Sequence, residues 1–129
     1  MGRIFVILSG LLGLLAVALG AFGAHGLRAR LEGLPDGVKR LEWWATAAHY
    51  NLAHALALGF AAWLVHREAG TPATVAGWAF FSGTLVFSGS LYAMTLTGQT
   101  RLGAVTPIGG ALLLVGWAAV IVAGVRLRG

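Results

Sequence analysis

A long run without charge, from Trp43 to His66, places the strongest constraint on the fold, because it contains no Asp, Glu, Lys or Arg. As a helix it would cross a bilayer, since about 20 residues span a hydrocarbon core of roughly 30 Å. Three further apolar runs have a similar length. We therefore predict an all-α polytopic membrane protein, a bundle of four transmembrane helices in one integral membrane domain. The helices are expected at residues 4–24, 38–66, 72–97 and 107–126.

The composition supports the bilayer as the solvent of this chain. Hydrophobic residues make up 58% of the 129 residues and charged residues only 10%, which is more apolar than soluble domains usually are. The net charge of +5 would suggest a nucleic-acid partner in a soluble protein. Here the basic residues flank the apolar runs, so we expect them to meet lipid phosphates and expect no nucleic acid. The chain has no cysteine, which excludes disulfides and thiolate chemistry.

Two stretches allow two interpretations each. Residues 4–24, preceded by Arg3, also fit a secretory signal peptide. Small residues recur there on one helical face, at Ser9, Gly13, Ala16, Gly20 and Gly23, and favour a retained helix that packs closely. Leucines at helical spacing between Leu27 and Glu42 predict a short amphipathic connection on the membrane surface, interrupted at Pro35. A solvated loop is the alternative.

Further residues indicate where helices begin, end and meet the interface. Thr71-Pro72 and Thr106-Pro107 resemble helix starts, and Gly98 resembles a helix end. Trp43, Trp44, Trp63 and Trp78 fit interfacial belts, whereas Trp117 lies mid-helix and is expected to pack. The last helix carries a small-residue stripe at Gly109, Gly116, Ala119 and Ala123. The basic residues do not decide the orientation: four lie on the side of the termini (Arg3, Arg67, Arg126, Arg128) and five on the other (Arg28, Arg30, Lys39, Arg40, Arg101).

Polar residues inside the apolar runs are the functional candidates, since polar groups at membrane depth are costly. Tyr50, Asn51 and His54 are predicted near the midplane, about 16 Å from the interface for His54. A second group is predicted near the end of the bundle at the first loop. The candidate polar pocket comprises His25, Tyr50, Asn51, His54, Ser88, Ser90, Tyr92 and Thr106. Alternatively, each group satisfies a neighbouring backbone in a tight bundle.

Four motifs resemble one known family in the right order. They are GAFGAHGL at 20–27, Tyr50 with HALAL at 54–58, FSGSLY at 87–92, and LG-x-x-TPIGG at 102–110 followed by Gly116-Trp117. Together they resemble the YgdD/YwdK-type family of small polytopic proteins of bacterial inner membranes, with mitochondrial relatives. The resemblance implies four transmembrane helices and a multi-pass location in the inner membrane. It implies no activity, cofactor or ligand, and His49 and His66 lie outside its motifs.

These residues favour a non-catalytic membrane module. No metal is expected, because His25 and His54 differ by roughly 10 Å or more in depth while Zn–N bonds are about 2 Å. We also expect no cofactor, because haem would need a large apolar slot. The leading hypothesis is a module that binds a lipid, a quinone-like molecule or a partner helix through Tyr50 and His54. The alternative is a small proton or solute pathway using His54 and the hydroxyls of the third predicted helix, residues 72–97. An enzyme ranks third, and a homo-oligomer is compatible with the small faces.

Overall fold

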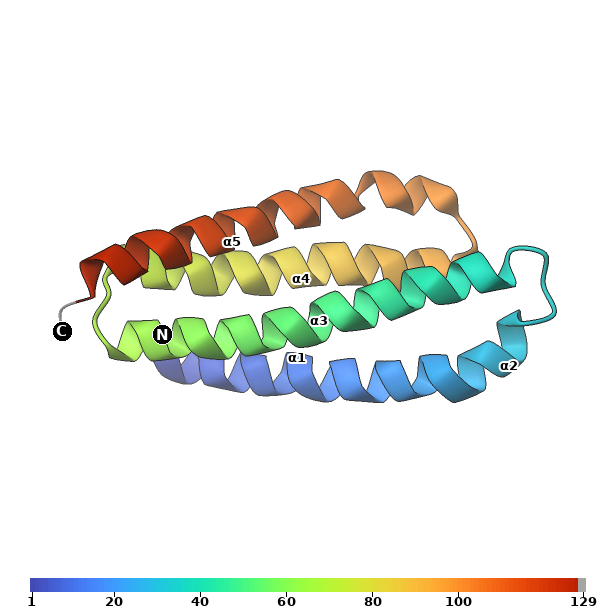
Figure 1. The fold of residues 1–129 in the computed structure, drawn as a ribbon, viewed down its shortest axis with the longest axis horizontal. Coiled ribbons are helices and arrows are strands. Elements are labelled where there is room, and N and C mark those ends of the chain that lie inside the picture. Colours follow the sequence, from blue (N-terminus) through green and yellow to red (C-terminus); the bar gives the residue numbers. More distant parts are fainter. Residues whose placement is uncertain (128–129) are drawn as a thin grey trace.

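The computed structural model describes residues 1–127, and within that part the regular structure is entirely helical (Figure 1). Arg128, which was expected among lipid headgroups, lies outside the described residues. The elements in chain order are α1 (Gly2–Phe22), the π-helical turn η1 (Gly23–Leu27), α2 (Arg28–Leu31), α3 (Gly37–His66), α4 (Thr71–Thr97), the 3₁₀ turn η2 (Thr100–Ala104) and α5 (Thr106–Arg126).

The long helices run antiparallel to their neighbours, and the amino terminus and the carboxyl end of α5 lie at the same end of the bundle (Figure 1). α1 packs on α3, α3 on α4, and α4 on α5. One buried core draws a side chain from each long helix: Phe5, Leu58, Phe80 and Leu113. α3 and α4 therefore form the centre of the molecule, with α1 and α5 on its flanks.

Large apolar side chains cover the outside of the flanking helices, including Leu14 and Val17 on α1 and Leu114 and Val125 on α5. Such a surface would be unstable in water and is normal against lipid. Three helical stretches within the described chain are long and apolar enough to cross a membrane, namely Gly2–Leu31, Thr71–Thr97 and Thr100–Arg126. α3 is not among them, because its interior polar residues lower its hydropathy. The structure thus supports a helical membrane protein with three candidate spans.

The first helix is longer than predicted. It does not end near residue 24 but continues through η1 to Leu31. Leu27 and Leu31 turn inward against Trp44, so this part of the expected surface connection belongs to the bundle. Gly37 then allows the chain to reverse, because a Cβ there would overlap the carbonyl oxygen of Leu31. Leu34 is exposed as predicted for a surface segment.

Small residues set most of the helix contacts that their spacing predicted, although no neighbouring atom lies within 4 Å of a Cβ at Gly20. Ser9 Oγ donates a 2.7 Å hydrogen bond to the Ala55 carbonyl, which joins α1 to α3. Ala16 is buried on the same face. On α5, a Cβ at Gly109 would overlap the Phe87 backbone, and one at Gly116 would lie 2.6 Å from the Phe80 ring. The glycines therefore bring α4 and α5 into close approach.

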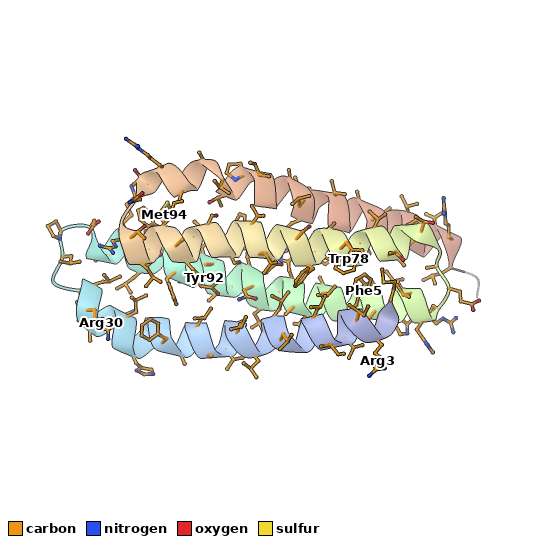
Figure 2. All side chains as sticks on the ribbon, turned by 180° about the vertical axis from the view of Figure 1, so that it is seen from behind. Arg3, Phe5, Arg30, Trp78, Tyr92 and Met94 are labelled. Carbon is orange, nitrogen blue, oxygen red and sulfur yellow. The ribbon has the colours of Figure 1, made fainter. Side chains whose placement is uncertain are left out.

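Trp44 corrects one prediction, because it is buried in the bundle and does not face the interfacial belt. Its side chain is 3% exposed, and its indole N–H donates a 2.7 Å bond to the Leu19 carbonyl of α1. A Cβ at Gly23 would overlap the indole, so that glycine makes room for it. Trp78 is more exposed and lies edge-on to Phe5, near the Arg3 end of the bundle (Figure 2).

Candidate functional site

His54 is buried on α3, and both of its ring nitrogens have partners. Nδ1 lies 2.8 Å from the Tyr50 carbonyl oxygen, one turn earlier on the same helix. The indole N–H of Trp117 donates to Nε2 across 3.1 Å, from α5. A carbonyl can only accept and an indole can only donate. These partners therefore assign the proton to Nδ1 and leave a neutral ring that links α3 to α5.

Aromatic rings surround this pair. The Tyr50 ring lies nearly parallel to the His54 ring, with an interplanar angle of 10° and centroids 5.8 Å apart. Phe87 of α4 lies 4.4 Å from Tyr50 by ring centroids, and Phe80 lies edge-on to Trp117 at 5.0 Å. The neighbourhood therefore offers flat, polarisable surfaces from three helices.

A groove of about 570 Å³ opens beside these rings, between α3 and α5, and Phe87 of α4 also lines it. Its volume falls in the range of roughly 300–1,000 Å³ that is usual for small-molecule sites. Tyr50 and Trp117 are both partly exposed to it, and the Tyr50 hydroxyl makes no hydrogen bond within residues 1–127. Gly110 helps to form the groove wall. The groove is lined mainly by apolar atoms, with one unpaired hydroxyl.

Asn51 lies away from this groove, in the interior between helices. Its Nδ2 donates a 3.1 Å bond to the Tyr92 hydroxyl of α4. Its Oδ1 is buried without a hydrogen-bond partner among the described residues. The Tyr92 ring also packs on Trp44, with centroids 4.6 Å apart. The buried amide thus forms a second polar centre that joins α3 to α4.

The serine hydroxyls on α4 bond mainly to backbone carbonyls. This fits the alternative in which each polar group satisfies a neighbouring backbone. Ser88 Oγ donates to the Ala47 carbonyl of α3 at 2.8 Å. Ser90 Oγ donates to the Phe87 carbonyl at 2.9 Å and lies 2.6 Å from Thr106 Oγ1 at the start of α5. Because the Ser90 proton is already used, Thr106 is the donor in this second bond. The Ser88 bond joins α4 to α3, and the bond between Ser90 and Thr106 joins α4 to α5.

The structure therefore brings some of the predicted pocket residues together and separates others. Tyr50 and His54 share the groove, whereas its lining includes none of the other six: His25, Asn51, Ser88, Ser90, Tyr92 and Thr106. His25 is exposed in the turn η1. Whether these residues serve a ligand stays a prediction. Within residues 1–127, no three His, Asp or Glu side chains are grouped to hold a metal ion.

Trp117 and Phe87 are the site residues that the sequence analysis missed. Trp117 was predicted to pack mid-helix, but its role as the hydrogen-bond donor to His54 was not foreseen. A depth count could have paired them, because Trp117 lies ten residues after Pro107 and so about 15 Å into the bilayer, close to the depth of His54. The rotation of α5 about its axis, which turns the indole toward α3, was not readable from one sequence.

Comparison with known proteins gives this chain a family but no activity. The family model described as a protein of unknown function, DUF423, matches residues 19–110. The UPF0382 membrane protein YwdK of Bacillus subtilis is 43% identical over 125 residues, covering 96% of this chain and 98% of that protein. A UPF0382 membrane protein of Staphylococcus epidermidis is 39% identical over 127 residues, covering 98% and 99%. No solved structure matches the chain significantly. The chain therefore belongs to the DUF423 family, whose relatives include the UPF0382 membrane proteins.

Proposed function

We propose that this protein is a four-span component of the bacterial inner membrane that holds a lipid-soluble molecule without transforming it. The binding site is the groove beside Tyr50, His54 and Trp117. The observation that carries the proposal is this aromatic groove, which combines a ligand-sized volume with one unpaired hydroxyl. The relatives are named as membrane proteins, which supports the location.

Three features of α3 support its assignment as the fourth span. It has no charged side chain between Glu42 and Arg67. It packs against α1 on one side and α4 on the other, and these two helices are candidate spans. Its buried polar groups Asn51 and His54 are bonded to Tyr92 and Trp117 of neighbouring helices. Such pairing inside the bundle lowers the cost of placing polar groups in a membrane.

The groove favours a flat ring with a carbonyl oxygen, such as a quinone-like molecule. Tyr50, Phe87 and Trp117 present ring faces and edges, against which a planar ligand would stack. The Tyr50 hydroxyl can donate to a ligand oxygen, because no described residue accepts from it. A plain acyl chain or an apolar partner helix would leave that hydroxyl unused.

The proton pathway has less support from this geometry. His54 would have to accept a proton at Nε2, and that lone pair already accepts the Trp117 indole N–H. The hydroxyls of Ser88 and Ser90 donate to backbone carbonyls and do not line the groove. The groove also lacks a carboxylate or a paired nucleophile and base, which supports a binding role over a catalytic one.

Quinone binding to the protein in nanodiscs tests the proposal. A short-chain benzoquinone should quench tryptophan fluorescence saturably. Gly110→Leu should abolish this, because the new side chain fills the groove. Tyr50→Phe should weaken binding about five-fold, the effect of losing one net hydrogen bond of about 1 kcal/mol. Gly124→Leu on the same helix is the control, since no atom lies within 4 Å of a Cβ there.

Three outcomes would contradict the quinone assignment. Equal quenching in Gly110→Leu and wild type would show that the groove is not the site. Quenching that occurs in detergent micelles but is lost in phospholipid nanodiscs would assign the groove to a lipid chain. A dimer in light scattering that Gly110→Leu dissociates would assign it to a partner helix.

A further inference from the structure

A second groove lies near the carboxyl end of α3, where the first turns of α1 meet the last turns of α3. Its volume is about 590 Å³, and its lining includes Gly2, Arg3, Val6, Gly59, Trp63 and His66. It shares no residue with the groove beside His54. This second groove is therefore a separate site from the one proposed above.

Two glycines line this groove where α1 packs closely on α3. A Cβ at Gly2 would lie 3.5 Å from the Ala62 carbonyl oxygen, and one at Gly59 would lie 3.1 Å from Ser9 Oγ. Val6 and Trp63 stand on either side and are 61% and 45% exposed. Since Arg3 and His66 lie at the bundle end and Val6 and Gly59 lie one to two turns further in, the groove is polar at its mouth and apolar along its depth.

The charge at this end has no acidic complement beside the groove. Arg3, Arg67 and Arg126 lie there, and Glu68 is the one acidic side chain at that end within residues 1–127. Glu68 does not line the groove. The ion pair found within the described chain joins Arg40 to Asp36 at the other end. Figure 2 shows Arg3 projecting from its end of α1, with Arg30 at the far end of the same continuous helix.

We infer that this second groove binds an anionic phospholipid. The phosphate would be held by the Arg3 guanidinium and a His66 N–H, and one acyl chain would lie along Val6 and Gly59. A free phosphate would leave the apolar depth uncovered. A zwitterionic lipid would bring a cation toward Arg3. Trp63 lies one turn before His66, at the level where amphipathic rings border headgroups.

Native mass spectrometry of the protein released from nanodiscs with equal phosphatidylglycerol and phosphatidylcholine tests this inference. We expect wild type to retain phosphatidylglycerol preferentially. Arg3→Gln should reduce its retention about five-fold, as for one basic side chain at an anionic surface. Arg30→Gln removes the same charge at the other end and should retain lipid like wild type.

A second pair of variants tests the apolar depth independently of charge. Val6→Trp should fill the groove and remove the retained lipid. Val17→Trp is its control, because Val17 is similarly exposed on α1, at 66%, and does not line the groove. Both positions are on the surface, so the fold should persist, as circular dichroism would verify. Equal retention of the two lipids by wild type, or unchanged retention in both Arg3→Gln and Val6→Trp, would overturn the inference.

Discussion

Two tryptophans illustrate two kinds of helix contact in this bundle. Trp44 joins α3 to α1 and Trp117 joins α5 to α3, each through its indole N–H. Trp44 donates to a backbone carbonyl and is 3% exposed, whereas Trp117 donates to the His54 side chain and is 45% exposed. The Trp44 indole is buried inside the bundle, whereas the Trp117 indole lines an open groove.

The difference separates a structural contact from a place where a ligand can compete. The Leu19 carbonyl is held in place by the backbone of α1, so the Trp44 bond fixes the distance between α1 and α3. The bond between His54 and Trp117 joins two side chains, and both line the groove in which a ligand would lie. We therefore expect the α1–α3 contact and the glycine contact of α4 with α5 to govern stability. The α3–α5 contact should govern binding.

The largest effect is expected from a substitution at Gly109, because a side chain there would disrupt the close approach of α4 and α5. Gly109→Leu places a side chain against the Phe87 backbone, so the helices must separate. The free energy of unfolding should fall by about 3 kcal/mol, the upper part of the range for overpacking. Steric trapping in bicelles would measure it.

Gly110 supplies the matched control for that prediction. A Cβ at Gly110 meets the Phe87 ring at 3.8 Å, an ordinary contact. Gly110→Leu should therefore leave the unfolding free energy nearly unchanged while removing ligand binding. Equal destabilisation by the two variants would show that the groove side of α5 is as tightly constrained as the packed side.

The two tryptophans give the next largest effect and test the comparison directly. Trp44→Phe removes a part-buried bond and leaves a gap beside Gly23, so it should cost about 2 kcal/mol. Trp117→Phe should cost only about 0.6 kcal/mol, the average for side-chain hydrogen bonds between membrane helices. Unfolding of both variants under the same conditions measures the difference. Equal costs would contradict the distinction between the two contacts.

A smaller effect than that of Trp44→Phe is expected in the interior pair of Asn51 and Tyr92. Tyr92→Phe leaves the Asn51 amide without its remaining partner, because Oδ1 is already unpaired, and should cost about 1 kcal/mol. In an Asn51→Leu background the same change should be nearly neutral. A double-mutant cycle of unfolding free energies measures this coupling. A cost unchanged by Asn51→Leu would mean that Tyr92 acts through its packing on Trp44 alone.

Sequence reasoning located most of the helices because charge-free runs and their flanking residues are local signals. It also predicted that Gly109 and Gly116 would lie at a helix contact, since their spacing places them on one face of α5. It ended the first helix too early, at residue 24, where the apolar run stops between Gly23 and Gly26. In the structure, the buried contacts of Leu27 and Leu31 with Trp44 outweigh the low helix propensity of those glycines.

The candidate site was predictable only in part. His54 and Tyr50 were predicted inward as neighbours, since residues four apart share a helix face. The partition of the remaining polar residues was not predictable, because depth along a helix does not reveal rotation about its axis. Asn51 and His54 lie at similar depth, yet one meets Tyr92 of α4 and the other meets Trp117 of α5.

The order of residues along this chain was enough to specify apolar helices, their approximate ends and the burial of Asn51 and His54, because these follow from the cost of exposing charge, polar groups or unpaired backbone to lipid. The packing of four helices determined which groups meet. It buried Trp44, left Trp117 beside a groove and gave His54 its partner on α5. Those outcomes depend on helix rotation and on contacts between residues 25 to 63 positions apart in the sequence, for which a linear pattern contains no signal.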